Sequence, residues 1–442
     1  MLLLHEQAKT LITISAGHLM KRYAIISFAL LFSSLCWADN SYDYPIDNPL
    51  AATVIGTPKA YTAELPNNIP RSDMKVVVFP DREMKKIISR KELHYTLVRQ
   101  KHAAPLVFSI AGTGASHRSA KMQLLEKAFY KAGMHVVSLP SPTYSNFIIT
   151  ASASQVPGHI VQDSADLYQL MELIKEQISD NVDVTEFYIT GYSLGGAQAA
   201  FVAKLDEERK IFNFKKVLMI NPPVSLFNSV SILDRMLEEN IPGGANNFNA
   251  FFEDLMKDFT KVYAELENLD FNDDFLYRIY EYEKEDINYS RVAATIGTSF
   301  RISSSNMIFT SDVLTNGGYI LPKNYELQKT TSTTDYFKVA SRISFTDYFN
   351  ERFYPFFSKL TPGTTPESLK HDTSLKSISD YLRSTEKIAV VHNEDDIILA
   401  PGEIDFFRDT FQSRAHIYPK GGHCGNMAYK DNVDYMINYF TN

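Results

Sequence analysis

Residues 187–197 read Phe-Tyr-Ile-Thr-Gly-Tyr-Ser-Leu-Gly-Gly-Ala, and they are the most informative segment of the sequence. Its first residues are typical of a β-strand, and the residues after Ser193 favour a helix. In a sharp turn from strand to helix, the residues two positions either side of the serine must be small, as Gly191 and Gly195 are. A chance match to Gly-x-Ser-x-Gly in a chain of this length is on the order of one in ten, so the flanking strand and helix give the prediction its weight. The stretch predicts that Ser193 is exposed as a nucleophile.

A nucleophilic serine needs a base, and the base needs a carboxylate that orients it. His423 follows the strand-like residues 416–418 and a turn with two glycines, and it precedes a helical segment. Asp396 lies just after the apolar run 388–391 and is followed by Ile397 and Ile398. We predict Asp396 as the acid, with Asp395 as the alternative. The acidic run 394–396 could also hold a cation, but a hard cation needs oxygens from other segments, and the sequence implies none.

The third requirement is a pair of backbone N–H groups that stabilise an oxyanion. Leu194 supplies one by its position after Ser193. The glycine-containing loop 109–115 is expected to supply the other, from Thr113 or from Gly112. A nucleotide-binding loop is excluded, because His117 stands where a third glycine is needed and no Gly-Lys-Ser/Thr follows. His117 and His392 are expected to be ordinary core or surface histidines.

Around these residues, apolar runs of strand length alternate with segments of helical periodicity. The predicted strands are 75–79, 95–98, 106–110, 136–139, 186–190, 216–220, 388–391 and 415–418, and the predicted helices are 119–132, 161–178, 194–205, 403–411 and 427–439. Such alternation predicts an α/β fold with a mostly parallel sheet of about eight strands covered on both faces. No helical segment separates the first two strands, so they are expected to form an antiparallel edge.

The alternation stops between residues 224 and 386. This segment is helical in pattern and rich in Phe and Tyr, and an apolar stripe recurs at helical spacing through Phe248, Phe251, Phe252, Leu255, Phe259, Val262, Leu266 and Leu269. Strand-like runs resume at residue 387. We therefore predict one helical insertion, 224–386, between two parts of the core, 39–223 and 387–442. Most of the stripe is expected to form the insertion's own core.

The N-terminus has the parts of a secretory signal peptide. Lys21 and Arg22 precede an apolar run of 13 residues, which Cys36-Trp37-Ala38 and a polar stretch follow. That run is too short to span a membrane. Met20 would serve as a natural start. We predict that residues 1–38 are a signal peptide and that the mature protein is secreted or periplasmic.

Composition narrows the classes of partner. The formal net charge of −8 argues against nucleic-acid binding, which needs clustered Lys and Arg. No later stretch of 18 or more apolar residues occurs, so no stable membrane span is expected in the mature chain. Cys36 would leave with the signal peptide, and Cys424 would remain as a single thiol. No metal or organic cofactor is implied.

The order Ser193, Asp396, His423 on alternating strands and helices resembles the α/β-hydrolase superfamily, over about residues 74–223 and 387–442. The resemblance makes Ser193 the nucleophile, Asp396 the acid, His423 the base, and Leu194 with Thr113 the oxyanion donors. Two positions depart from the common pattern: Ala111 precedes Gly112 where many members have His-Gly, and Asn393 stands where Gly is common. The insertion resembles the helical caps of this superfamily.

These observations predict a serine hydrolase that cleaves a small-molecule or lipid ester, or a related acyl bond, through an acyl-enzyme. The fold alone does not fix the substrate. A peptidase or amidase and an acyltransferase are the alternatives among enzymes. A catalytically inactive secreted binding protein is the alternative from another class.

Overall fold

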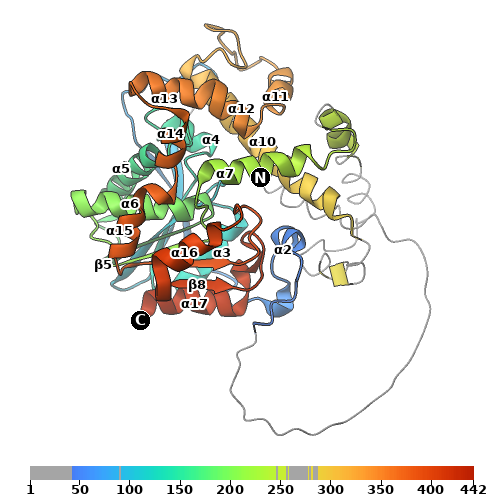
Figure 1. The fold of residues 1–442 in the computed structure, drawn as a ribbon. Helices are drawn as coiled ribbons and strands as arrows, with labels where there is room; N and C mark the ends of the chain where they lie inside the picture. The colour runs from blue at the N-terminus through green and yellow to red at the C-terminus, as the bar shows by residue number, and fades with distance from the viewer. Residues whose placement is uncertain are drawn as a thin grey trace, which may run out of the picture.

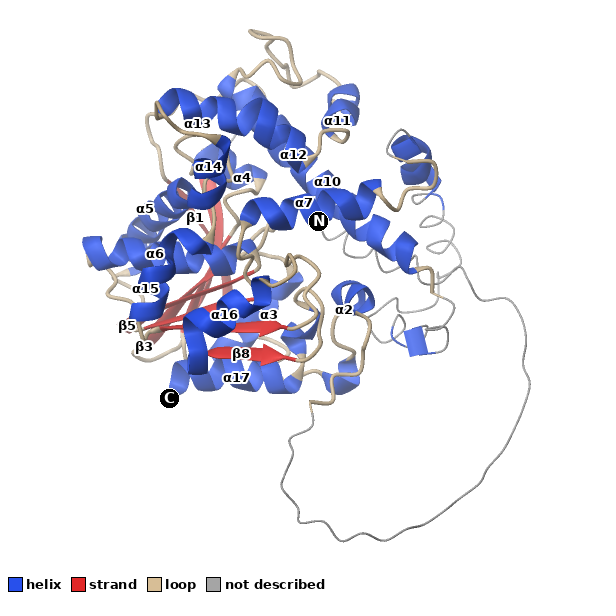
Figure 2. Cartoon of the chain, viewed as in Figure 1, coloured by secondary structure: helices blue, strands red, loops and turns tan. Residues whose placement is uncertain are grey.

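The computed structural model describes residues 42–88, 91–244, 247–254, 257, 277, 280–281 and 287–442. An eight-stranded sheet lies at its centre, with helices around it (Figures 1 and 2). The strands are β1 (Arg71–Val77), β2 (Glu92–Val98), β3 (Ala104–Ile110), β4 (His135–Leu139), β5 (Val184–Tyr192), β6 (Lys216–Ile220), β7 (Ile388–Asn393) and β8 (Ala415–Tyr418). Their order is β1-β2-β4-β3-β5-β6-β7-β8.

Strand β2 alone runs in the direction opposite to the other seven strands. It pairs antiparallel with β1 and with β4, and strands β3 to β8 pair parallel to one another. This order, with β4 placed between β2 and β3, is the topology of the α/β-hydrolase fold. The predicted fold class and the antiparallel edge are confirmed.

Helices cover both faces of the sheet, because its strands are apolar on both sides. Helices α5 (Ile160–Ile178), α6 (Leu194–Arg209), α15 (Ser379–Ser384) and α16 (Glu403–Phe411) pack on one face. Helices α3 (Ala120–Lys131) and α17 (Lys430–Thr441) pack on the other. Successive residues of a strand alternate between the two cores: Phe108 belongs to the first and Val107 to the second.

Between β6 and β7 the chain forms the predicted extra helical region. Its described helices are α7 (Leu226–Glu238), α10 (Tyr289–Thr315), α11 (Thr334–Ala340), α12 (Phe345–Tyr348), α13 (Tyr354–Leu360) and α14 (Pro366–Asp372), followed by α15 of the core. A π-helical turn, Phe349–Phe353, joins α12 to α13. Figure 1 shows α7, α10 and α12 lying across one end of the sheet.

A buried ion pair fixes how these helices cross. Arg301 of α10 and Asp234 of α7 lie 3.2 Å apart, each with a side chain 6% exposed. Asp234 also accepts hydrogen bonds from the backbone N–H groups of Phe345 and Thr346, at the start of α12. The carboxylate of Asp234 therefore ties α7, α10 and α12 together at one point.

The predicted elements differ from the structure mainly at their ends. Strand β1 begins at Arg71 rather than at residue 75, because its alternating, largely exposed residues at the sheet edge carry little apolar signal. The last helix begins at Lys430, after a 3-10 turn over Gly425–Ala428. Of the apolar stripe, Phe248 and Phe251 are buried and contact Phe252 in a small cluster. Leu255, Phe259, Val262, Leu266 and Leu269 lie outside the described residues, as do residues 1–38 and Cys36.

Two further segments bear on the site. Helix α4 (Ser145–Thr150) follows β4, and helix α2 (Pro49–Ile55) precedes the sheet, with Asn48 as its N-cap. Within the part of the chain that is described, every helix is too short or too polar to cross a membrane.

Candidate active site

Ser193 stands at the tip of the turn between β5 and α6. Its backbone has φ 55° and ψ −128°, a strained conformation for a residue with a side chain. The turn closes only because its flanks are glycines: a Cβ on Gly191 would lie 2.3 Å from the carbonyl oxygen of Gly195, and one on Gly195 would lie 2.2 Å from that of Ile110. The strain holds the Ser193 hydroxyl at the carboxyl end of the sheet.

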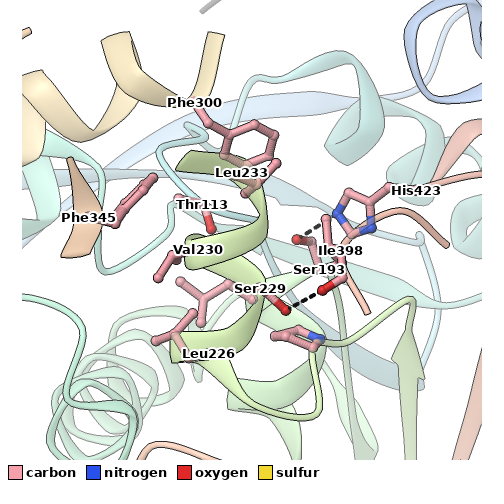
Figure 3. A pocket seen from close by; sticks show the side chains of 12 residues that line it. Thr113, Ser193, Leu226, Ser229, Val230, Leu233, Phe300, Phe345, Ile398 and His423 are labelled. Atoms are coloured by element: carbon pink, nitrogen blue, oxygen red, sulfur yellow. Dashed lines mark hydrogen bonds between the residues drawn. The ribbon is translucent and has the colours of Figure 1, made fainter. Parts of the chain in front are cut away.

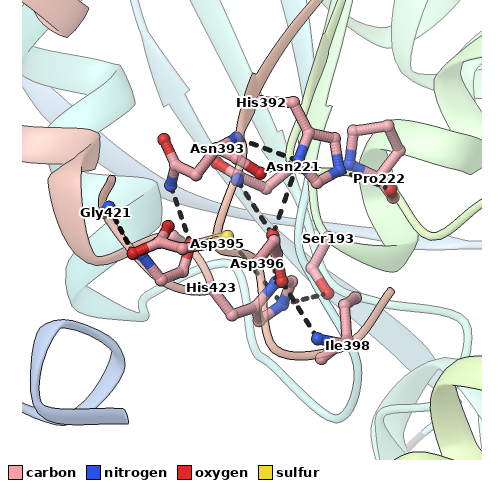
Figure 4. Close-up of polar contacts among 12 residues, drawn as sticks. Ser193, Asn221, Pro222, His392, Asn393, Asp395, Asp396, Ile398, Gly421 and His423 are labelled. Atoms are coloured by element: carbon pink, nitrogen blue, oxygen red, sulfur yellow. Dashed lines mark hydrogen bonds and ion pairs between the residues drawn. The ribbon is translucent and has the colours of Figure 1, made fainter. Parts of the chain in front are cut away.

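His423 links Ser193 to a carboxylate. Its Nε2 lies 3.0 Å from the Ser193 Oγ, and its Nδ1 lies 3.0 Å from each oxygen of Asp396. The three side chains come from segments that follow β5, β7 and β8; β7 and β8 are neighbours in the sheet, and β6 lies between β5 and β7. Figure 4 shows the three side chains close together. The structure thus brings the three predicted residues into one hydrogen-bonded line.

Asp396 is fully enclosed and held by two further donors. Asn221 donates its side-chain amide to Oδ2 at 3.0 Å, and the backbone N–H of Ile398 donates to Oδ1 at 3.1 Å. Burial raises the pKa of Asp396, but the facing His423, together with His392 and the Ile398 N–H, outweighs burial and lowers the pKa below its ordinary value. Asp396 therefore stays ionised and fixes the Nδ1–H tautomer of His423.

The neighbouring acidic residues face other partners. Asp395 accepts hydrogen bonds from the backbone N–H groups of Gly421 and Gly422, at 3.2 and 2.9 Å, and so holds the loop that carries His423 (Figure 4). Glu394 pairs with Arg408. The three carboxylates of the run diverge, and no group of three potential metal ligands is found among the described residues.

We predict that activity falls as pH drops through a midpoint above 6.5. Burial lowers the pKa of His423, but the charge of Asp396 outweighs it, so this pKa stands above the ordinary histidine value. A protonated His423 cannot accept the proton of Ser193, so kcat/KM rises only as His423 loses its proton. The kcat/KM profile for an ester substrate measures the midpoint. Histidine NMR titrations of Ser193→Ala, with and without Asp396→Asn, provide the control: the His423 pKa should fall when Asp396 is neutralised.

The loop 109–115 passes beside Ser193. Three of its amides are already paired: Ala111 N–H donates to the carbonyl oxygen of Leu139, Gly114 N–H to the Oγ1 of Thr143, and Ala115 N–H to the carbonyl oxygen of Gly112. Thr113 and Leu194 both line the cavity that contains Ser193 and His423. Leu194 is the first residue of α6, where a helix leaves its backbone N–H groups without intrahelical partners.

Helix α2 packs directly on the loop that carries His423. Thr53 accepts a hydrogen bond from the backbone N–H of His423 at 2.8 Å, and Thr57 donates to the carbonyl oxygen of Gly425 at 2.9 Å. The contact is close: a Cβ on Gly422, whose φ is 56°, would lie 2.2 Å from the carbonyl oxygen of Pro49. Residues 42–57, which we call the N-terminal clasp, therefore help to place His423.

We predict that Thr53→Ala lowers kcat about fivefold with little change in KM. The substitution removes one hydrogen bond to the His423 loop, worth about 1 kcal/mol, and leaves the triad residues in place. Thr53→Ser should restore the rate, because it keeps the hydroxyl. Thr62→Ala is the matched control, because this half-buried threonine lies just after the clasp and its hydroxyl donates to the carbonyl oxygen of Lys59. Equal losses in both alanine variants would show that the Thr53 contact has no role in placing the base.

A cavity opens above Ser193, and we call it the site cavity. It encloses about 320 Å³, counting space open to solvent. The extra helical region provides one wall through Leu226, Ser229, Val230 and Leu233 of α7, with Phe300 and Phe345, and His423 lies on the opposite side from Phe345 (Figure 3). Ser229 donates a hydrogen bond to the carbonyl oxygen of Ile398 at 2.7 Å, which anchors α7 beside the acid.

His117 and His392 lie outside the hydrogen-bonded line, although His392 Nδ1 is 3.7 Å from an oxygen of Asp396. His392 is buried, contacts the carbonyl oxygen of Pro222 at 3.0 Å, and has its pKa lowered by burial. His117 pairs with Thr96 at 2.8 Å. Sequence reasoning missed Asn221 and Thr53. Asn221 directly follows β6, and a residue at the carboxyl end of a parallel strand is expected to lie near the site. Nothing in the sequence around Thr53 indicated that it lies near the site.

No family model and no curated protein matches the chain. Among solved structures, it is similar to fungal esterases from Rhizomucor miehei, with 13% identity, 86% of this chain and 85% of that chain covered, and a TM-score of 0.42. It is also similar to a proline iminopeptidase from Mycobacterium smegmatis, with 12% identity, 83% and 97% covered, and a TM-score of 0.39. At these scores the likeness says nothing about the activity of this chain. The α/β-hydrolase fold is identified by the order of the strands.

Proposed function

We propose that the protein is a serine hydrolase that cleaves a carboxylic ester or related acyl bond. One observation carries the proposal: the unbroken line of hydrogen bonds from Asp396 through His423 to Ser193, on the floor of the site cavity. Ser193 and His423 are 7% exposed, so only a group that enters the cavity meets them. An ionised acid, a base with a fixed tautomer and a strained serine together make an acyl-transfer site.

The geometry supports a two-step reaction. The Ser193 Oγ attacks the ester carbonyl carbon while Nε2 of His423 takes the hydroxyl proton, and the carbonyl oxygen becomes an oxyanion facing the N–H groups of Leu194 and Thr113. The carbon–oxygen bond to the alcohol breaks, and His423 returns the proton to the departing alcohol. Water, deprotonated by His423, then attacks the acyl-serine, and the carboxylic acid leaves with Ser193 restored.

Active-site labelling tests this function. A fluorophosphonate probe should form an adduct with the wild-type protein at Ser193, as mapped by peptide mass spectrometry, and should not label Ser193→Ala. Turnover of matched ester, amide and thioester substrates then separates an esterase from a peptidase or amidase. An unlabelled wild-type protein, or an adduct at another residue, would favour a binding protein without catalysis.

The extra helical region is proposed to act as a cap over the site. Its helix α7 lines the site cavity, where apolar side chains exclude water from the oxyanion. We predict that hydrolysis of p-nitrophenyl esters depends on acyl chain length, with one preferred range, because the walls of the cap limit the space around Ser193. A flat profile of kcat/KM from acetate to long acyl chains would show that the cap does not select the acyl group.

We also propose that the protein is exported after removal of residues 1–38. The proposal rests on the charged, apolar and small-residue segments that precede Asp39. Expression of the full chain in a bacterial host, followed by fractionation and intact-mass measurement, tests it. The expected product begins at Asp39 and is found outside the cytoplasm; an uncleaved cytoplasmic product would contradict the proposal.

A further inference from the structure

A second cavity meets the site cavity, and we call it the side cavity. It encloses about 540 Å³, counting space open to solvent. The two cavities share five lining residues: Thr113, Leu194, Leu226, Val230 and Phe345. Ser193 and His423 line the site cavity and are not among the residues of the side cavity. The side cavity therefore begins at the two proposed oxyanion donors and extends away from the base.

The wall of the side cavity is largely apolar, and three of its four side-chain hydroxyl groups are already paired. Phe227, Met307, Phe349 and Phe353 add to the shared apolar residues, the last two from the π-helical turn. Tyr348 donates to the carbonyl oxygen of Pro157 at 3.0 Å, Thr143 accepts from Gly114, and Thr373 donates to the carbonyl oxygen of Leu369. No Asp, Glu, Lys, Arg or His lines it. Such a wall accommodates an apolar group and offers little to a polar one.

The chemistry of acyl transfer assigns a direction to each half of an ester. The oxygen of the departing alcohol must lie within reach of the His423 Nε2, which protonates it. The alcohol half therefore lies in the site cavity. The carbonyl oxygen points to Thr113 and Leu194, and the remaining substituent, the acyl chain, must extend away from His423. Figure 3 shows Thr113 and Val230 between His423 and Phe345, in the direction of the shared wall.

We propose that the side cavity binds the acyl chain and the site cavity binds the alcohol, so that the substrates are esters of an extended apolar acyl chain. This division rests on the proposed ester hydrolysis and adds which cavity selects which half. Residues that contact the acyl chain act on binding and on both chemical steps, because only the acyl half stays on the enzyme after the alcohol leaves. The side cavity should therefore govern deacylation as well as acylation, and the alcohol wall should govern acylation alone.

Two matched substitutions test the division. Phe227→Leu changes the side cavity only, and Phe300→Leu changes the site cavity only; both side chains are half-buried. One substrate series varies the acyl chain on a fixed p-nitrophenol, and a second varies the alcohol on a fixed acyl chain. Phe227→Leu should shift the acyl-chain preference by about fivefold or more, toward longer chains, and leave the alcohol ranking unchanged. Phe300→Leu should change the alcohol ranking and leave the acyl-chain preference unchanged.

The outcomes separate this inference from the function on which it rests. If the wild-type protein hydrolyses no ester and is not labelled at Ser193, the proposed function fails. If Ser193-dependent hydrolysis is present but Phe300→Leu moves the acyl preference and Phe227→Leu moves the alcohol ranking, the cavities are assigned the wrong way round. Should both variants move both series equally, no division exists. Phe349→Leu, in the π-helical turn, repeats the side-cavity test if Phe227→Leu does not fold.

Discussion

Ser193→Ala should lose a factor of about 10⁴ to 10⁶ in kcat for ester hydrolysis while the fold remains intact. The Ser193 hydroxyl makes one side-chain hydrogen bond, to Nε2 of His423, so its removal leaves no other buried group unpaired. What remains is catalysis by the oxyanion donors and by binding. Steady-state kinetics on purified protein, with circular dichroism to show that the fold is unchanged, measure the loss.

A second serine provides the control for Ser193→Ala. Ser179→Ala removes a hydroxyl at the exposed end of α5, where it donates only to the carbonyl oxygen of Glu176. This variant should keep wild-type kcat and KM. Retention of substantial hydrolysis by Ser193→Ala, with no contaminating esterase in the preparation, would remove Ser193 as the nucleophile.

Asp396→Asn should lose about 10⁴ in kcat. Both oxygens of Asp396 accept hydrogen bonds: Oδ1 from the backbone N–H of Ile398 and Oδ2 from the Asn221 amide. In Asp396→Asn, an amide nitrogen replaces one of these two oxygens. That nitrogen would face the Ile398 N–H or the Asn221 amide, and it would also donate a hydrogen bond to Nδ1 of His423. His423 would then carry its proton on Nε2, where it cannot accept the proton of Ser193.

Asp395→Asn is the matched comparison, one residue away and with the same change of charge. Its carboxylate accepts from the amides of Gly421 and Gly422, and an asparagine keeps one of the two acceptors. The loss in kcat should be about tenfold or less, which is the range expected for one weakened hydrogen bond. If Asp395→Asn were the more damaging variant, the acid would be Asp395 and the hydrogen-bonded line would have another geometry in solution.

Much of the core could be predicted because its signals are local. Each parallel strand is a short apolar run between helical segments. The eleven residues around Ser193 combine a strand pattern before the serine with a helix pattern after it. The glycines after β3 indicated the loop 109–115, which lies beside Ser193; its role as an oxyanion donor stays a prediction. The predicted bounds of the edge strand β1 were shifted by a few residues, because an exposed strand carries a weak apolar pattern. The interpretations of residues 1–38 and of Leu255, Phe259, Val262, Leu266 and Leu269 remain predictions, because these residues lie outside the described part of the chain.

The contacts that hold the base and the acid could not be predicted, because they join residues far apart in the sequence. Thr53 contacts the backbone of His423 across 370 positions, and Asn221 contacts Asp396 across 175. A polar residue near a chain end or after a strand has many possible partners, and periodicity does not choose among them. The choice of Asp396 over Asp395 rested on two apolar neighbours, and the structure places Asp396 against His423.

The N-terminal clasp also bears on the order in which the protein can assemble. Residues 42–57 are synthesised long before the loop at 421–426 that they contact, and such a contact between the two ends of a chain closes late and slowly. Strands β1 to β6 and Ser193 precede the loop 421–426 in the sequence and are synthesised before it. His423 can reach Thr53 only after that loop has been made. On the proposed mechanism, partly synthesised or C-terminally truncated chains would therefore contain Ser193 without His423 and be inactive.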